Sequence, residues 1–195
     1  MIPILLLLGR VAESASTSVE QALGLSPVQA GIDFDSPSPD QVSECKISAQ
    51  KIGESVGWVV TDPDGIVLRQ FLDTNGDNVV DQWRYHKNGL EVYRDVDADF
   101  NGKADQYRWF HTGGTRWATD KDEDGVVDAW KTIAAEEVTA EVVAALATRN
   151  ARRFARLVLT DSELKSLGIG REKANELRKK LAGLPAKFND LAARQ

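Results

Sequence analysis

Apolar and polar side chains alternate with a period of two along much of the middle of the chain, which is the pattern of strands with one buried face. Turn signals separate these runs at Asp62-Pro63-Asp64-Gly65, at Asn88-Gly89 and at Gly113-Gly114. The pattern predicts consecutive hairpins that pair residues 58–61 with 66–72, residues 83–86 with 90–93, and residues 107–109 with 115–118.

The Asn88-Gly89 pair is the strongest of these turn signals, because both residue types tolerate the positive φ of a type I′ turn. If these two residues form the turn, alternation assigns every neighbouring side chain to a face. One face then carries Trp83, Tyr85, Leu90 and Val92, and the other carries Arg84, His86, Glu91 and Tyr93.

After Lys131 the apolar period lengthens towards that of an α-helix. Residues 136–148 form an amphipathic pattern whose stripe is Val138, Val142, Val143 and Leu146. Asn150 is a candidate cap for a second helix, and Thr160 with Glu163 has the form of a capping box for a third. A longer helix is expected over 171–182, stopped by Gly183. The predicted fold class is α+β, with an antiparallel β-meander of hairpin repeats over residues 45–132 followed by a helical domain over 133–195.

The N-terminal part has a different composition. Residues 2–8 are apolar and too few to span a bilayer, and they fit the central region of a secretory signal peptide, with Ala12 and Ser14 at the cleavage positions. No Lys or Arg precedes this run, and a short buried segment is the alternative. We therefore interpret residues 1–14 as a signal-peptide remnant and expect a secreted or cell-envelope protein. Residues 15–44 are rich in Ser, Ala and Pro without a sustained period, which predicts a linker with no core of its own.

An acidic sequence motif occurs three times in the strand region, as DTNGDNVVDQW from Asp73, DADFNGKADQY from Asp97 and DKDEDGVVDAW from Asp120. Alternate oxygen-bearing residues in a tight loop point towards one centre, and a hard divalent cation takes six to eight such oxygens. With the position-seven residues contributing backbone carbonyls, the predicted metal ligands are Asp73, Asn75, Asp77, Val79 and Asp81 in the first loop, Asp97, Asp99, Asn101, Lys103 and Asp105 in the second, and Asp120, Asp122, Asp124, Val126 and Asp128 in the third.

Calcium is the predicted ion, with up to three bound. Mg²⁺ demands stricter octahedral geometry, and Zn²⁺ and copper prefer His or thiolate ligands, which these loops lack. Position six, where each loop turns sharply, holds Asn78, Gly102 and Gly125, which accept a left-handed backbone. The alternative is a set of Asp- and Asn-rich surface turns that need no metal.

A helix-loop-helix EF-hand is disfavoured, because position twelve holds a basic residue in each copy where that motif has a bidentate Glu. Over residues 73–130 the three motifs instead resemble the calcium loops between strands of integrin-alpha type propeller repeats and those of thrombospondin type 3 repeats. That resemblance implies that the position-nine residues Asp81, Asp105 and Asp128 close the three sites, and the first loop departs from it by having Asn78 in place of Gly. Over residues 45–167 the chain is similar to a group of uncharacterised exported bacterial proteins, through FLDTNGDNVVDQW, EVYRDVDADFNGKADQYRW and AEEVTAEVVAAL.

Composition limits the remaining function classes. The 195 residues carry 24 Lys and Arg against 30 Asp and Glu, so the net charge of -6 argues against a chain devoted to nucleic acid or anionic lipid. The single Cys45 excludes a disulfide scaffold and is expected either to be buried or to pair with another chain. His86 and His111 are expected far from the acidic loops, so the sequence predicts no enzyme.

The predicted function is a calcium-stabilised structural or adhesion module, with calcium ions and an unknown protein or envelope component as partners and no transmembrane segment. The alternative is a weak nucleic-acid binder, because Leu167-Gly168-Ile169-Gly170 resembles the turn of helix-hairpin-helix modules and basic side chains surround it. An ordinary turn between two helices is the simpler interpretation of that segment.

Overall fold

The computed structural model describes residues 18–111 and 114–194. The chain divides into two compact units, with the boundary between Thr132 and Ile133. The predicted signal-peptide remnant lies outside the described residues, as does Gly113 of the predicted third turn. No helix within the described ranges is long and apolar enough to cross a membrane.

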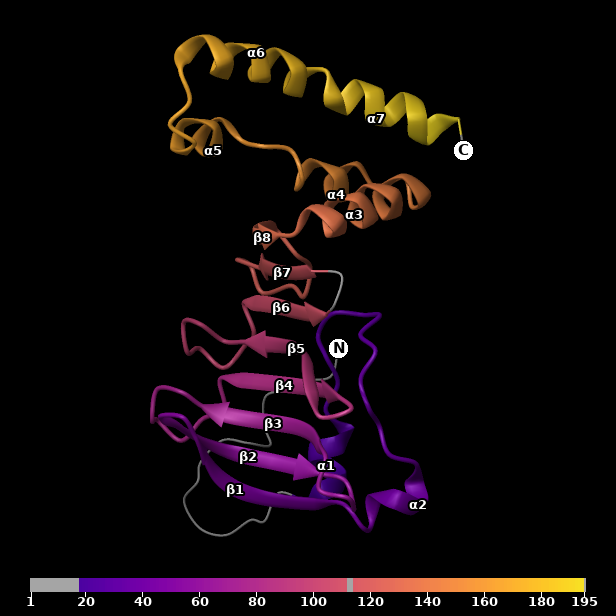
Figure 1. Ribbon diagram of the computed structural model, residues 1–195, viewed down its shortest axis with the longest axis vertical. Coiled ribbons are helices and arrows are strands. Elements are labelled where there is room, and N and C mark those ends of the chain that lie inside the picture. The colour runs from indigo at the N-terminus through magenta and orange to yellow at the C-terminus, as the bar shows by residue number, and fades with distance from the viewer. Residues whose placement is uncertain (1–17, 112–113, 195) are drawn as a thin grey trace. The chain divides into compact units, whose positions relative to one another are not determined.

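The first unit is built on an eight-stranded sheet in which each strand pairs with the next one along the chain (Figure 1). Each of the six pairs from β1–β2 to β6–β7 is antiparallel, which confirms the predicted meander of consecutive hairpins. The strands are β1 (Lys46–Ile52), β2 (Ser55–Thr61), β3 (Val67–Asp73), β4 (Gln82–Lys87), β5 (Leu90–Val96), β6 (Gln106–His111), β7 (Gly114–Thr119) and β8 (Ala129–Ile133).

The turn between β4 and β5 is the predicted Asn88-Gly89 pair. Lys87 pairs with Leu90, and the two turn residues have φ of 49° and 75°. The predicted face of Tyr93 is wrong, however, because a bulge shifts the register so that Tyr85 pairs with Tyr93, while His86 still pairs with Glu91. One extra residue in β5, Val92, reverses the alternation and brings Tyr93 to the same face as Tyr85.

That face holds an aromatic core. Tyr85, Tyr93, Tyr107 and Trp109 are at least 93% buried in one cluster, and successive rings lie 5.3 to 6.5 Å apart. A second cluster joins Val60, Phe71 and Val80 to a helix residue, Ala22. Most of these rings are tilted or edge-on, the arrangement that aromatic pairs prefer.

The segment predicted to be a linker packs on this sheet instead. It contains α1 (Val19–Gly24) and α2 (Pro39–Val42). Helix α1 begins after a capping box at Ser18. Between the two helices Phe34 packs edge-on against Tyr85 at 5.4 Å, and the Asp35 backbone N–H donates to the His86 carbonyl at 2.9 Å. The apolar residues of this segment do not recur at a regular spacing, because they pack singly on the aromatic face of the sheet and the segment has no continuous apolar face.

The second unit contains five helices in its described part; the first four confirm the predicted C-terminal helices, and the fifth was not predicted. They are α3 (Ala135–Ala147), α4 (Ala151–Ala155), α5 (Asp161–Ser166), α6 (Arg171–Ala182) and α7 (Leu184–Ala193). The Asn150 cap and the Thr160–Glu163 capping box are both present. Phe154 stacks on Phe188 at 4.6 Å beside buried Ala145.

The buried side of α3 differs from the predicted valine stripe. Val143 is 60% exposed, whereas Glu137 and Glu141 are buried. Glu141 tolerates burial because Arg153 donates two hydrogen bonds to its carboxylate, both at 2.7 Å.

Candidate metal centre

The three acidic loops lie at the same end of the strands, where β3 leads to β4, β5 to β6 and β7 to β8 (Figure 1). Backbone hydrogen bonds tie each loop to the next. The Asp97 N–H donates to the Asp81 carbonyl, and the Asp120 N–H donates to the Asp105 carbonyl, both at 2.8 Å. The first residue of each later loop is therefore fixed against the last residue of the loop before it.

The loops share one internal hydrogen-bond pattern, so the three copies of the sequence motif adopt the same backbone conformation. The position-one carboxylate accepts from the position-six N–H in every copy: Asp73 from Asn78 at 2.9 Å, Asp97 from Gly102 at 2.6 Å and Asp120 from Gly125 at 2.8 Å.

Positions five and nine follow the same rule. The position-five side chain accepts from the position-seven N–H, in the pairs Asp77–Val79 (2.8 Å), Asn101–Lys103 (3.0 Å) and Asp124–Val126 (2.8 Å). The position-nine carboxylate accepts from the position-two N–H, in the pairs Asp81–Thr74 (2.8 Å), Asp105–Ala98 (3.0 Å) and Asp128–Lys121 (2.9 Å).

The backbone at position six is left-handed in all three loops, as predicted, with φ of 67° at Asn78, 92° at Gly102 and 82° at Gly125. A second left-handed residue stands at position four, which the sequence analysis missed. It is Gly76 in the first loop, but Phe100 (61°) and Glu123 (55°) occupy it in the other two. Residues other than Gly rarely adopt this conformation, so the fold holds two side chains in an uncommon backbone region.

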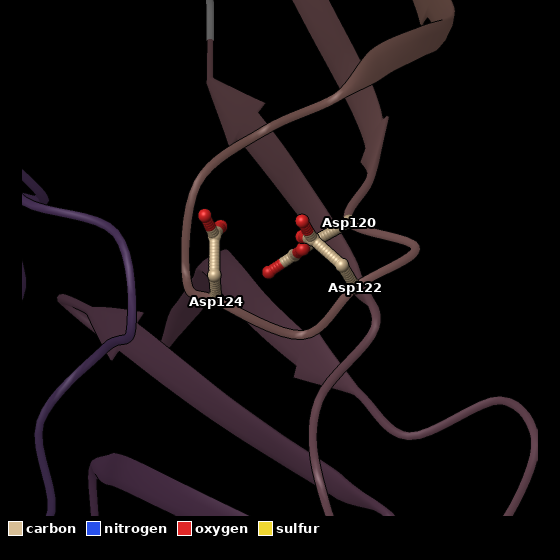
Figure 2. Close-up of side chains that lie close together, drawn as sticks. All are labelled: Asp120, Asp122 and Asp124. Carbon is tan, nitrogen blue, oxygen red and sulfur yellow. The ribbon is translucent and has the colours of Figure 1, made fainter.

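The third loop brings three carboxylates together. Oxygen atoms of Asp120, Asp122 and Asp124 all lie within 4.8 Å of one another, and Figure 2 shows the three groups inside the curve of the loop. Such a cluster could hold a metal ion. Asp122 and Asp124 are exposed, so an ion would reach this side of the cluster from solvent.

Asp120 forms the floor of this cluster and is fully buried. Its Oδ2 accepts from the Tyr107 hydroxyl at 2.7 Å as well as from the Gly125 N–H. Its Oδ1 is buried without a hydrogen-bond partner. An unsatisfied buried carboxylate oxygen is costly, and a cation held between Asp120, Asp122 and Asp124 would supply what that oxygen lacks.

The first two loops use more of their carboxylate oxygens internally. Asp73 accepts from Gly76 and Asn78 with its two oxygens, and Asp81 accepts from the N–H and the hydroxyl of Thr74. Among the described residues, the third loop is where three carboxylates converge in the present geometry. The other predicted side-chain ligands, and the predicted carbonyl ligands Val79, Lys103 and Val126, stay predictions.

Without a metal ion, the surroundings of several loop carboxylates disfavour their ionised state. Burial is the main cause that raises the pKa of Asp81, of Asp97 and of Asp105 above the ordinary value. The pKa of Asp122 is raised first by desolvation and then by the neighbouring charges of Asp124 and Asp128. A bound cation would reverse this tendency, because it stabilises the ionised carboxylates.

Buried tyrosines support the loops from inside the sheet, and the sequence analysis did not find this arrangement. Besides the Tyr107–Asp120 bond, the Tyr93 hydroxyl donates to Asp95 Oδ1 at 2.5 Å, and Asp95 is 98% buried. Burial raises the pKa of Asp95 to about 7. The available signal was the spacing of Tyr93 and Asp95, two residues apart on one strand and hence on one face.

No protein-family model matches the chain, and searches of curated proteins and of solved structures find no match. The donors of the acidic loops are carboxylate, amide and carbonyl oxygens, without a His or thiolate in any loop, and this donor set suits hard cations.

Proposed function

We propose that the first unit is a calcium-stabilised β-module, in which up to three Ca²⁺ ions bind the acidic loops at one end of the strands. The observation that carries this proposal is Asp120, a buried carboxylate with an unpartnered oxygen that faces two further carboxylates. The common hydrogen-bond pattern extends the proposal to the other two loops, with Asp81, Asp105 and Asp128 closing the sites.

Calcium fits this donor set better than magnesium. Each motif offers four side chains and one carbonyl as ligands. Ca²⁺ tolerates the resulting irregular coordination shell, which water would complete. Mg²⁺ requires a nearly regular octahedron and gives up its water reluctantly.

The ions would act as structural links between strands. Without an ion, repulsion among the carboxylates opposes the loop conformation, and with an ion the binding free energy adds to the free energy of unfolding. Extracellular calcium modules have Kd values of about 10⁻⁴ to 10⁻³ M. At roughly 10 mM Ca²⁺ each site would then add about 1.4 to 2.7 kcal/mol.

The apolar run over residues 2–8 supports export. We therefore place the module in a secreted or cell-envelope setting, with a structural or adhesive role and a protein or envelope component as its partner.

Thermal unfolding tests the proposal. The full chain should melt at least roughly 5 to 10 °C higher in 10 mM CaCl₂ than in EDTA, the rise that one occupied site would give, and 10 mM MgCl₂ should give a much smaller rise. Identical melting curves in calcium and EDTA would refute the proposal.

The nucleic-acid alternative gains little support from the C-terminal unit. Gly168 is left-handed (φ 63°) and Gly170 precedes α6, as an ordinary turn between helices also requires. Several of the basic side chains around the turn are paired internally, since Arg178 binds Asp161 while Lys173 and Lys180 both bind Glu176.

A further inference from the structure

The face of the sheet opposite the tyrosines carries a row of basic side chains. Cross-strand pairing aligns Arg84 with Arg94, Arg94 with Arg108, and Arg108 with Trp117 on the neighbouring strands β4 to β7. The Lys131 ammonium, from β8, lies 4.4 Å from the centre of the Trp117 ring. We call these five residues, Arg84, Arg94, Arg108, Trp117 and Lys131, the guanidinium row.

The acidic repeat itself generates this row. Arg84, Arg108 and Lys131 each stand three residues after the position-nine Asp, where the EF-hand loop would have its bidentate Glu. Because side chains alternate along a strand, one spacing places all three on the same face. Adjacent strands lie about 4.8 Å apart, so β4, β5 and β6 place Arg84, Arg94 and Arg108 at close intervals, and the Trp117 ring separates them from Lys131.

Charge within the row is poorly compensated. Arg94 makes an ion pair with Glu91, at 2.5 and 2.9 Å. Arg84 donates to the neutral Gln82 side chain, at 2.9 and 3.3 Å. Arg108 stacks on the Trp117 ring at 4.0 Å, and its buried Nε has no hydrogen-bond partner among the described residues. Like charges directly opposite each other destabilise a sheet, so the fold tolerates a cost here that a bound anion would remove.

The row also has neutral polar neighbours suited to hydroxyl groups. Gln82 and Gln106 stand two residues before Arg84 and Arg108 and therefore face the same side of the sheet. Gln106 already accepts a hydrogen bond from Trp117 Nε1 at 2.8 Å, which holds the indole in place beside the arginines.

The surrounding charge restricts the type of anion. The chain totals are 24 basic and 30 acidic residues, and residues 133–195 contain twelve and eight of these, so residues 1–132 carry a net charge of −10. A duplex nucleic acid, with one negative charge per about 1.7 Å of its axis, would be repelled by most of this unit. A chain with fewer, more widely spaced carboxylates can meet the forked guanidinium groups bidentately without that repulsion.

We propose that the guanidinium row binds an acidic polysaccharide, whose carboxylates pair with Arg84 and Arg108, two strands apart, and whose hydroxyl groups meet the adjacent glutamines, while Arg94 between them keeps its ion pair with Glu91. No member of the row belongs to an acidic loop, so the inference does not depend on calcium binding.

The test titrates the full chain with fluorescently labelled hyaluronan, a linear polysaccharide whose charges are all carboxylates, in buffer with 1 mM CaCl₂. Carboxyl-reduced hyaluronan and a short DNA duplex serve as comparison ligands. The variant Arg84→Gln with Arg108→Gln removes two forks, and the matched control Lys51→Gln removes one charge from exposed β1.

We expect hyaluronan binding that weakens with added salt, is absent for the reduced polymer, and falls at least about tenfold in the double variant but less than about twofold in Lys51→Gln. If the double variant does not fold by circular dichroism, Arg108→Gln alone should still weaken binding, because it removes one of the two forks and leaves the hydrogen bonds from Arg84 to Gln82 in place. Equal binding by these variants, or a preference for the duplex through the same arginines, would overturn the inference.

Discussion

Replacing Asp120 by Asn should have opposite effects on stability with and without calcium. The amide oxygen of the Asn can still accept from the Tyr107 hydroxyl and the Gly125 N–H, which Asp120 binds at 2.7 and 2.8 Å. The amide nitrogen takes the place of the unpartnered Oδ1 and can donate to the facing carboxylates of Asp122 and Asp124. In EDTA the variant should therefore be at least as stable as the wild type.

In calcium the same change removes a ligand from the third site. One ion contributes about 1.4 to 2.7 kcal/mol at roughly 10 mM Ca²⁺ if its Kd lies between about 10⁻³ and 10⁻⁴ M. For a unit of this size the variant should then lose roughly 5 to 10 °C of the calcium-dependent rise in Tm.

Urea unfolding and thermal melts of the wild type, of Asp120→Asn and of Asp64→Asn should be recorded in EDTA and in 10 mM CaCl₂. Asp64 is exposed in the β2–β3 turn, so its substitution makes the same chemical change outside the loops. If Asp120→Asn lowers stability by equal amounts in both buffers, Asp120 serves only as an acceptor for Tyr107 and Gly125, and the reasoning fails.

Three further predictions concern stability without metal. Burial raises the pKa of Asp95 to about 7, so the native state keeps a proton that the unfolded chain releases, and the free energy of unfolding should fall by up to about 4 kcal/mol as pH rises from about 4 to 7. Asp95→Asn should remove that dependence and be the more stable protein at pH 8 in urea titrations. Gly57→Ala should cost at least about 2 kcal/mol in chemical unfolding, because its Cβ would lie 2.1 Å from the Phe71 carbonyl oxygen. Arg153→Met should cost about 2 kcal/mol in unfolding of the second unit, because it leaves the Glu141 carboxylate buried without its bidentate partner.

Each of these has a control and a contradictory result. A pH profile of Asp95→Asn parallel to that of the wild type would show that Asp95 does not titrate as argued. Gly24→Ala is the matched control for Gly57→Ala, since nothing lies within 4 Å of the added Cβ at Gly24, and equal stabilities of the two variants would contradict the close approach of β2 and β3. If Arg153→Met unfolds like the wild type, Glu141 is not held by that ion pair.

Local signals in the sequence were enough to predict the hairpins and the loops. The Asn88-Gly89 turn and the left-handed residue at position six depend on residues within a few positions of each other, and both are present. The face of Tyr93 was predicted wrongly, because a bulge of one residue, Val92, reverses the alternation and leaves no mark in the pattern.

Tertiary contacts decided the features that the sequence could not predict. Phe34 is one aromatic residue in an aperiodic segment, and only the assembled row of tyrosines makes its position favourable. Glu141 is buried on α3 because Arg153 reaches it from another helix. The partly buried guanidinium row likewise becomes visible only when the register aligns Arg84, Arg94 and Arg108.

Equilibrium dialysis against radioactive calcium counts the bound ions without reference to stability. If the three loops bind calcium, the protein should saturate at about three ions per chain, with half-saturation between about 10⁻⁴ and 10⁻³ M. Retention of no calcium above the buffer level at 10 mM would show that the loops are not calcium sites.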